Sequence, residues 1–257
     1  MFAGVVGLGA LLVFQVQLVL GKQLLPWYGG TSAVWTTCLL FFQAALLAGY
    51  AWAHLVVGRL SPRRQRDAHL ALVGSAAALL CWRAVTWPSP ITPAEPAGSA
   101  GDTPILSILG LLTSTVGLPF VALAATSPLL QAWLARLRPG SSPFWLFALS
   151  NAGSLLGLVS YPLVVEPMAS VRTQGWLWSA AFAAYAAGVA WCAHATPRDV
   201  RRPGPEASAG IADPSGPGQT WSLGMAVALA FFPSVMLAAV TSHLTQEVAA
   251  VPFLWML

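Results

Sequence analysis

Residues 2–20, FAGVVGLGALLVFQVQLVL, contain no charged side chain and are long enough to cross a bilayer as a helix, which takes about 20 apolar residues. Residues 21–31, GKQLLPWYGGT, follow with one lysine among Pro, Trp, Tyr and Gly. Residues 32–57 form a second uncharged stretch of membrane-spanning length. The pattern predicts two membrane helices whose connecting segment has an unusual composition for a simple turn.

The composition of the whole chain excludes a soluble globular protein. Over 257 residues it is 57% hydrophobic and 8% charged, with a mean hydropathy of +0.71, whereas soluble domains carry about 25% charged residues. Because so few charged groups cannot cover a wetted surface, the composition predicts an all-α, polytopic membrane helix bundle. The lipid bilayer is therefore the first expected partner.

The order of the apolar stretches suggests two unequal parts. Residues 1–193 are expected to form a six-helix membrane bundle, residues 194–220 a cytoplasmic Pro/Gly-rich linker, and residues 221–257 a seventh membrane helix and the start of an eighth. This layout is typical of a major-facilitator first half followed by the beginning of a second half. We expect a fragment of a longer protein or a truncated reading frame, completed by a missing C-terminal half or by a homo-oligomer. The predicted spans are 2–20, 32–57, 70–87, 105–125, 144–164, 173–193 and 221–241, with the eighth beginning at Val251.

The basic residues predict the orientation. Nine of the 12 Lys and Arg residues lie in three alternate connections, and the other three lie at the opposite helix ends: Lys22, Arg83 and Arg172. By the positive-inside rule the N-terminus is cytoplasmic and the three exceptions face outward. The formal net charge of +4 therefore reports orientation, and no nucleic-acid partner is expected.

Residues 103–135 leave two alternatives open, because they are too long for one straight crossing. Pro119 and Pro128 offer breaks, after which a segment would lie along the inner interface. Alternatively, the whole stretch is one tilted and kinked helix.

Polar residues within the apolar spans are the candidates for binding, since such side chains are costly in hydrocarbon and usually face a bundle interior or a cavity. We expect Lys22 to lie within reach of Glu166 or Glu247 at the outer end of the bundle. The alternative is that Lys22 and Glu166 are ordinary helix-end residues at the interface. The candidate substrate-binding residues are Gln17, Lys22, Trp35, Gln43, Asn151, Glu166, His243 and Glu247.

Two further groups of polar residues have simpler interpretations. Asn151 and Ser154, beside Gly153 and Gly157, are typical of a small-residue packing face with interhelical hydrogen bonds. His54 and His69 flank the basic inner connection and are expected to be solvated. The three cysteines stand alone in separate spans, so neither a disulfide framework nor a zinc site is expected.

Motifs of soluble enzymes are missing from the chain. It contains no GxGxxG, GxxxxGK[ST], HExxH or GxSxG pattern and no closely spaced carboxylate pair. We therefore predict no enzymatic activity for this chain, no catalytic residue, no metal and no cofactor.

Several blocks of the chain resemble the membrane region of the bacterial proteins in which a major-facilitator-like domain is fused to a spermidine synthase. The resemblance implies a bacterial inner-membrane protein whose relatives continue into a soluble aminopropyltransferase domain, which is absent here. It also implies a polyamine or related small cationic metabolite as ligand. The matching blocks are FQVQ (14–17), GK (21–22), LPWYGG (25–30), VWTTCLLFFQ (34–43), ATSPLLQ (125–131), LSNAGSL (149–155), SYP (160–162), EP (166–167), TQEVA (245–249) and VPFLW (251–255).

Three functions follow as alternatives. The chain is a non-catalytic membrane domain of a spermidine-synthase-like fusion protein, a major-facilitator transporter half that needs completion or dimerisation, or a simple membrane anchor.

The predicted topology can be tested by labelling. In a background without Cys38, Cys81 and Cys192, Gly98→Cys should react with an impermeant maleimide on intact cells, because the connection that holds it is expected outside. Arg64→Cys should react only after the membrane is permeabilised. Labelling of both positions from the same side would contradict the topology.

Overall fold

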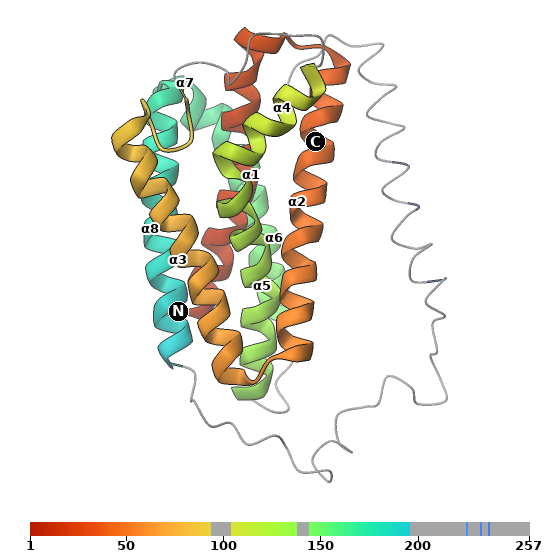
Figure 1. Ribbon diagram of the computed structural model, residues 1–257, viewed down its shortest axis with the longest axis vertical. Helices are drawn as coiled ribbons and strands as arrows, with labels where there is room; N and C mark the ends of the chain where they lie inside the picture. The colour runs from red at the N-terminus through yellow and green to blue at the C-terminus, as the bar shows by residue number, and fades with distance from the viewer. Residues whose placement is uncertain (94–103, 138–143, 196–224, 226–231, 233–235, 237–257) are drawn as a thin grey trace.

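The structure, a computed structural model, describes residues 1–93, 104–137 and 144–195, together with Met225, Phe232 and Met236. Six helices in this part are long and apolar enough to cross a membrane. The prediction of an all-α membrane helix bundle with six successive spans is confirmed (Figure 1). Apart from these three residues, the predicted seventh and eighth helices lie outside the described residues, as does the linker from residue 196 onward.

The elements follow one another with short connections where both sides are described. Two spans contain a π-helical turn, labelled η, between their α-helical parts. The elements are α1 (Phe2–Tyr28), α2 (Ser32–Arg59), α3 (Pro62–Thr86), α4 (Pro104–Leu112), η1 (Thr113–Gly117), α5 (Leu118–Leu137), α6 (Phe144–Ser160), η2 (Tyr161–Val165), α7 (Glu166–Met168) and α8 (Val171–Ala195).

Two predicted boundaries were wrong. The first helix continues to Tyr28, so Lys22 is helical and does not belong to a loop. The helix is capped by Gly29, whose φ of 74° favours a residue without a side chain. The third helix begins at Pro62 and not at residue 70, because proline is suited to the first helical position. Arg63, Arg64 and Arg66 therefore occupy the start of α3, and Arg59 is the last residue of α2.

The long fourth span is one continuous helical run of 34 residues, Pro104–Leu137. The alternative with a break was wrong, because the run continues through both prolines, and the structure shows a single helix that contains a π-helical turn. Pro119 has no N–H, so the carbonyl of Thr115 loses its usual donor four residues later. The turn Thr113–Gly117 is π-helical, and Arg83 of α3 donates its Nη1 to that carbonyl at 2.5 Å.

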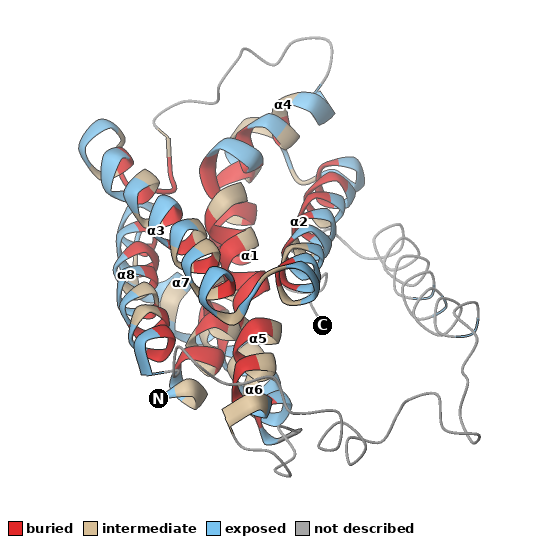
Figure 2. Ribbon diagram, turned by 60° about the horizontal axis from the view of Figure 1, so that its bottom comes forward, coloured by how far each residue is buried: buried red, intermediate tan, exposed pale blue. Residues whose placement is uncertain are grey.

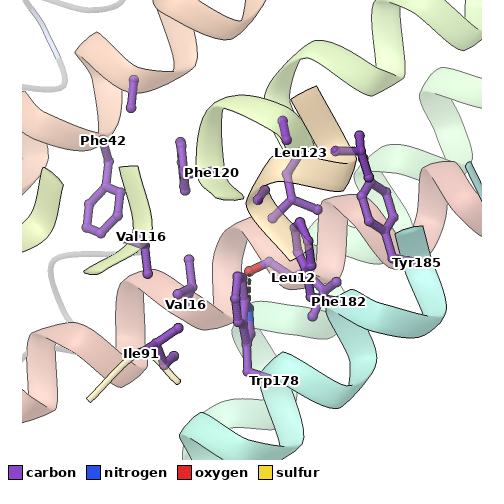
Figure 3. Packing of buried hydrophobic residues seen from close by; sticks show 14 of the residues in the cluster. Leu12, Val16, Phe42, Ile91, Val116, Phe120, Leu123, Trp178, Phe182 and Tyr185 are labelled. Atoms are coloured by element: carbon purple, nitrogen blue, oxygen red, sulfur yellow. Dashed lines mark hydrogen bonds between the residues drawn. The ribbon is translucent and has the colours of Figure 1, made fainter. Parts of the chain in front are cut away.

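Helix α1 lies at the centre of the bundle. It packs against α6, α8 and α5, and Figure 2 shows the buried residues gathered on it and on the facing sides of its neighbours. Leu12 and Val16 of α1 are completely buried. In Figure 3 the indole Nε1 of Trp178 donates to the Leu12 carbonyl at 2.9 Å, which ties α8 to the middle of α1.

The pairing of α1 with α6 rests on glycine. A Cβ atom at Gly153 would clash with the carbonyl oxygen of Gly7, and one at Gly157 would lie 2.8 Å from the carbonyl oxygen of Leu11. The predicted small-residue packing face is confirmed at the two glycines, but the interhelical hydrogen bond expected of Ser154 is not seen, because its Oγ donates to the Ser150 carbonyl of its own helix at 3.0 Å. Because residue numbers rise together along both helices, α1 and α6 run parallel.

A methyl group at Gly153 should destabilise the bundle. Gly153→Ala is expected to lower the free energy of unfolding by about 1–3 kcal/mol through overpacking, measured by thermal or denaturant unfolding of the purified chain in detergent. Gly74→Ala in α3 is the matched control, because nothing lies within 4 Å of a Cβ there, and it should be neutral or slightly stabilising. Equal effects of the two substitutions would contradict this account.

Candidate functional site

An ion pair joins α1 to α7 at one end of the bundle. The Lys22 Nζ lies 2.9 Å from the Glu166 Oε1, with the two side chains 34% and 44% exposed. The predicted proximity of Lys22 and Glu166 is confirmed. The glycine contacts fix how α1 and α6 lie side by side. Followed further along the two parallel helices, the same register places residue 22 of α1 opposite residue 166, just after α6.

Hydrogen bonds below the pair hold the turn that presents Glu166. Tyr161 in η2 donates its hydroxyl to the Gln174 Oε1 at 3.0 Å, and the Gln174 Nε2 donates to the Ala169 carbonyl at 2.8 Å. Both Tyr161 and Gln174 are buried. The start of α7 is thus fixed from inside, while the carboxylate of Glu166 remains partly open to water.

An exposed ion pair contributes little to stability, about 0–1 kcal/mol. Its partners can therefore exchange at low cost. At the Lys22–Glu166 pair, an external cation could replace the Lys22 ammonium as the partner of the Glu166 carboxylate.

The remaining described candidates do not join this pair. The Gln17 Nε2 donates to the Val13 carbonyl of its own helix at 3.0 Å. Trp35 is buried and packs against the backbone beside Lys22, where a Cβ on Gly21 would lie 2.9 Å from its ring. Gln43 and Asn151 are exposed on the outer faces of α2 and α6. His243 and Glu247 lie outside the described residues.

A buried polar cluster, which we call the His69 cluster (His69, Thr126 and Tyr185), joins α3, α5 and α8. His69 is completely buried, so the expectation that it is solvated was wrong. Its Nε2 lies 2.9 Å from the Thr126 Oγ1, and the Tyr185 hydroxyl donates to the same oxygen. The rings of His69 and Trp133 are nearly perpendicular, with 6.2 Å between their centroids.

One arrangement of protons satisfies all three contacts of Thr126. Its hydroxyl donates to the Ala122 carbonyl at 2.8 Å, and its oxygen accepts from the Tyr185 hydroxyl and from a protonated Nε2 of His69. The His69 Nδ1 has no hydrogen-bond partner among the described residues.

The sequence contained a signal for this cluster. The buried side chains of α3 recur every three or four residues, as one face of a helix requires: Gln65, His69, Val73, Ala76, Leu80 and Arg83. Placing the helix start at residue 70 hid that stripe, because His69 then lay before the helix.

Within the described residues no three His, Cys, Asp or Glu side chains come together as metal ligands could. We also compared the chain with protein-family models, curated proteins and solved structures, and none of the three comparisons found a match. The resemblance to the spermidine-synthase fusion proteins therefore stays a hypothesis.

Removing the shared acceptor should weaken the bundle. Thr126→Val keeps the side-chain shape but leaves the buried donors of His69 and Tyr185 without their acceptor, so the free energy of unfolding should fall by about 1–3 kcal/mol. Unfolding in detergent measures it. Thr113→Val is the control, because among the described residues that exposed hydroxyl bonds only the Leu109 carbonyl of its own helical turn, at 2.7 Å. If both variants unfold alike, the His69 cluster does not hold the three helices together.

Proposed function

We propose that this chain is the non-catalytic membrane domain of a spermidine-synthase-like fusion protein and that it handles a small cationic metabolite of the polyamine class. The proposal combines an integral membrane domain of six apolar helices with an exchangeable ion pair at one end of it. In the proposed orientation the N-terminus is cytoplasmic, the membrane is a bacterial inner membrane, and the pair faces outward, since Lys22 lies opposite the basic connections.

The single observation that carries the proposal is the contact of the Glu166 carboxylate with the Lys22 ammonium at 2.9 Å. A primary ammonium on a flexible alkyl stem is the same chemical group as the end of a polyamine. A carboxylate that accepts the Lys22 ammonium has the charge and the reach to accept the ligand ammonium instead. Because the carboxylate is 44% exposed, the incoming group does not require the helices to separate.

A second candidate, the transporter half, is favoured by Gln43 and Asn151. Both amide side chains are exposed on α2 and α6, and a polar group that faces lipid is costly. Packing of these faces against further membrane helices, from a second half or a second copy of the chain, would remove that cost. Under this proposal Glu166 meets the cation at the mouth of a path that is completed by those helices.

Substitutions of the two members of the ion pair should have opposite effects on spermidine affinity. Glu166→Gln should weaken spermidine binding about tenfold or more, since it removes one charge-assisted contact. Lys22→Met should strengthen binding, because it removes the internal ammonium that competes for Glu166. Calorimetric titration of spermidine onto the purified chain in nanodiscs measures both changes.

The control for these variants is Asp67→Asn. Asp67 is an exposed carboxylate that also pairs with a basic neighbour, Arg66, at 3.1 Å. If spermidine were attracted to any surface carboxylate, loss of Asp67 would weaken binding as much as loss of Glu166. Spermidine affinity should stay unchanged in Asp67→Asn. If Glu166→Gln and Asp67→Asn behave alike, or if the chain binds no spermidine, the membrane-anchor interpretation is favoured instead.

A further inference from the structure

Arginines gather at the end of the bundle where α2 leads into α3. The carboxylate that the described residues place at this end, Asp67, is already held by Arg66, whose Nε and Nη2 both donate to its Oδ1 at 3.2 and 3.1 Å. This end of the bundle therefore carries an excess of positive charge. The arginines come from the end of α2, the start of α3 and the last turn of α5: Arg59, Arg63, Arg64, Arg66 and Arg136.

A buried amide holds these three helix ends together. The Gln65 Nε2 donates to the carbonyls of Val57 and Leu60 at 3.2 and 2.8 Å, and the Gln65 Oε1 accepts from the Arg136 Nη1 at 2.9 Å. The Gln65 side chain is only 2% exposed. One residue in the first turn of α3 thus binds the last turns of α2 and α5, so the arginines stand on a fixed support.

Arg59 and Arg64 are the two arginines of this group whose charge is available. Both are exposed, and neither forms a hydrogen bond or an ion pair with another described residue. They stand on either side of the short connection between α2 and α3, which Gln65 clamps. Their guanidinium groups can therefore meet an external partner without breaking any contact of the described bundle.

The length of α2 places these groups at the depth of lipid headgroups. The helix has 28 residues and is about 42 Å long, whereas the hydrocarbon core is about 30 Å thick and the bilayer with its headgroups about 40–45 Å. The uncharged residues 32–57 fill the hydrocarbon. Arg59 at the end of α2 and Arg64 at the start of α3 then lie at the level of the phosphates.

The kind of cation at this end suits a phosphate. All the basic residues described here are arginines, and the single lysine of the chain, Lys22, lies at the opposite end. A guanidinium presents parallel N–H groups that bind two phosphate oxygens at once, whereas an ammonium acts as a point charge. Clusters of basic residues directly beside a membrane span attract anionic lipids.

The outer face of α3 leaves room for the lipid below its headgroup. Past Asp67, the exposed positions over the next three turns carry only small side chains, and nothing lies within 4 Å of a Cβ at Gly74. An acyl chain can lie along this face without displacing a side chain. The small residues are Ala71, Gly74, Ser75 and Ala78.

We propose that Arg59 and Arg64 form a docking surface for the headgroups of anionic phospholipids in the leaflet at this end of the bundle. The lipid phosphate accepts hydrogen bonds from the guanidinium groups and supplies the opposite charge, and an acyl chain lies along the small-residue face of α3. The surface is remote from Glu166, so it stands whether or not that residue binds a cationic metabolite.

A short-chain lipid tests the surface on the full chain. Dihexanoyl-phosphatidylglycerol is titrated calorimetrically onto the chain in dodecyl maltoside, which carries no phosphate, and the heat of the same titration into empty micelles is subtracted. Arg59→Gln and Arg64→Gln should each weaken binding about fivefold, and the double variant should weaken it further, because each arginine near an anionic surface contributes separately. Circular dichroism establishes that each variant is helical.

Arg172→Gln is the matched control, since Arg172 is an exposed arginine at the opposite end of the bundle, and it should bind the lipid like the wild-type chain. Dihexanoyl-phosphatidylcholine and sodium phosphate should both bind the wild-type chain more weakly than dihexanoyl-phosphatidylglycerol.

The proposal is overturned if the double variant matches the wild-type chain or if Arg172→Gln loses as much affinity. Equal binding of the zwitterionic lipid or of sodium phosphate also overturns it, because the surface would then not select an anionic lipid. Should the double variant fail to fold, the two single variants decide by the same criteria.

Discussion

The close contact between the backbones of α1 and α6 is the constraint on which the rest of the arrangement depends. Gly153 and Gly157 have no side chain to separate these helices, so their backbones meet and their register is fixed. Higher along the same interface the Gln15 Nε2 donates to the Ser160 Oγ at 3.2 Å, and Lys22 then meets Glu166. A shift of one turn in this register would move the ammonium by about 5.4 Å and break the ion pair.

Prolines inside three of the described membrane spans create the other recurring problem. In a bilayer each freed carbonyl needs a donor from the protein, because no water can supply one. At Pro119 the answer is a π-helical turn and the guanidinium of Arg83. At Pro162 a second π-helical turn leads directly into the segment that carries Glu166. The candidate site at Lys22 and Glu166 thus lies next to a place where proline interrupts a regular helix.

Some polar residues of the bundle have all their hydrogen-bonding groups engaged, and others keep groups that could accept or donate further hydrogen bonds. Thr126 is fully used, since its single oxygen serves three helices. Arg83 keeps an unused charged edge, and Glu166 keeps an exposed oxygen. Because a satisfied buried group chiefly stabilises, the partly exposed carboxylate of Glu166 is the better candidate for recognition.

The sequence by itself determined the class and the number of spans in the described part, because length and apolarity act through the bilayer and need no tertiary contact. It placed Lys22 at the same end of the bundle as Glu166 and Glu247, but the pairing with Glu166 depends on the register between α1 and α6. It did not determine that His69 is buried or that Arg83 reaches Thr115. Those outcomes depend on where α3 begins and on which carbonyl Pro119 leaves free in a neighbouring helix. Only tertiary packing decides them, since a hydrogen bond between residues far apart in the chain requires two helices to fix each other's rotation and depth.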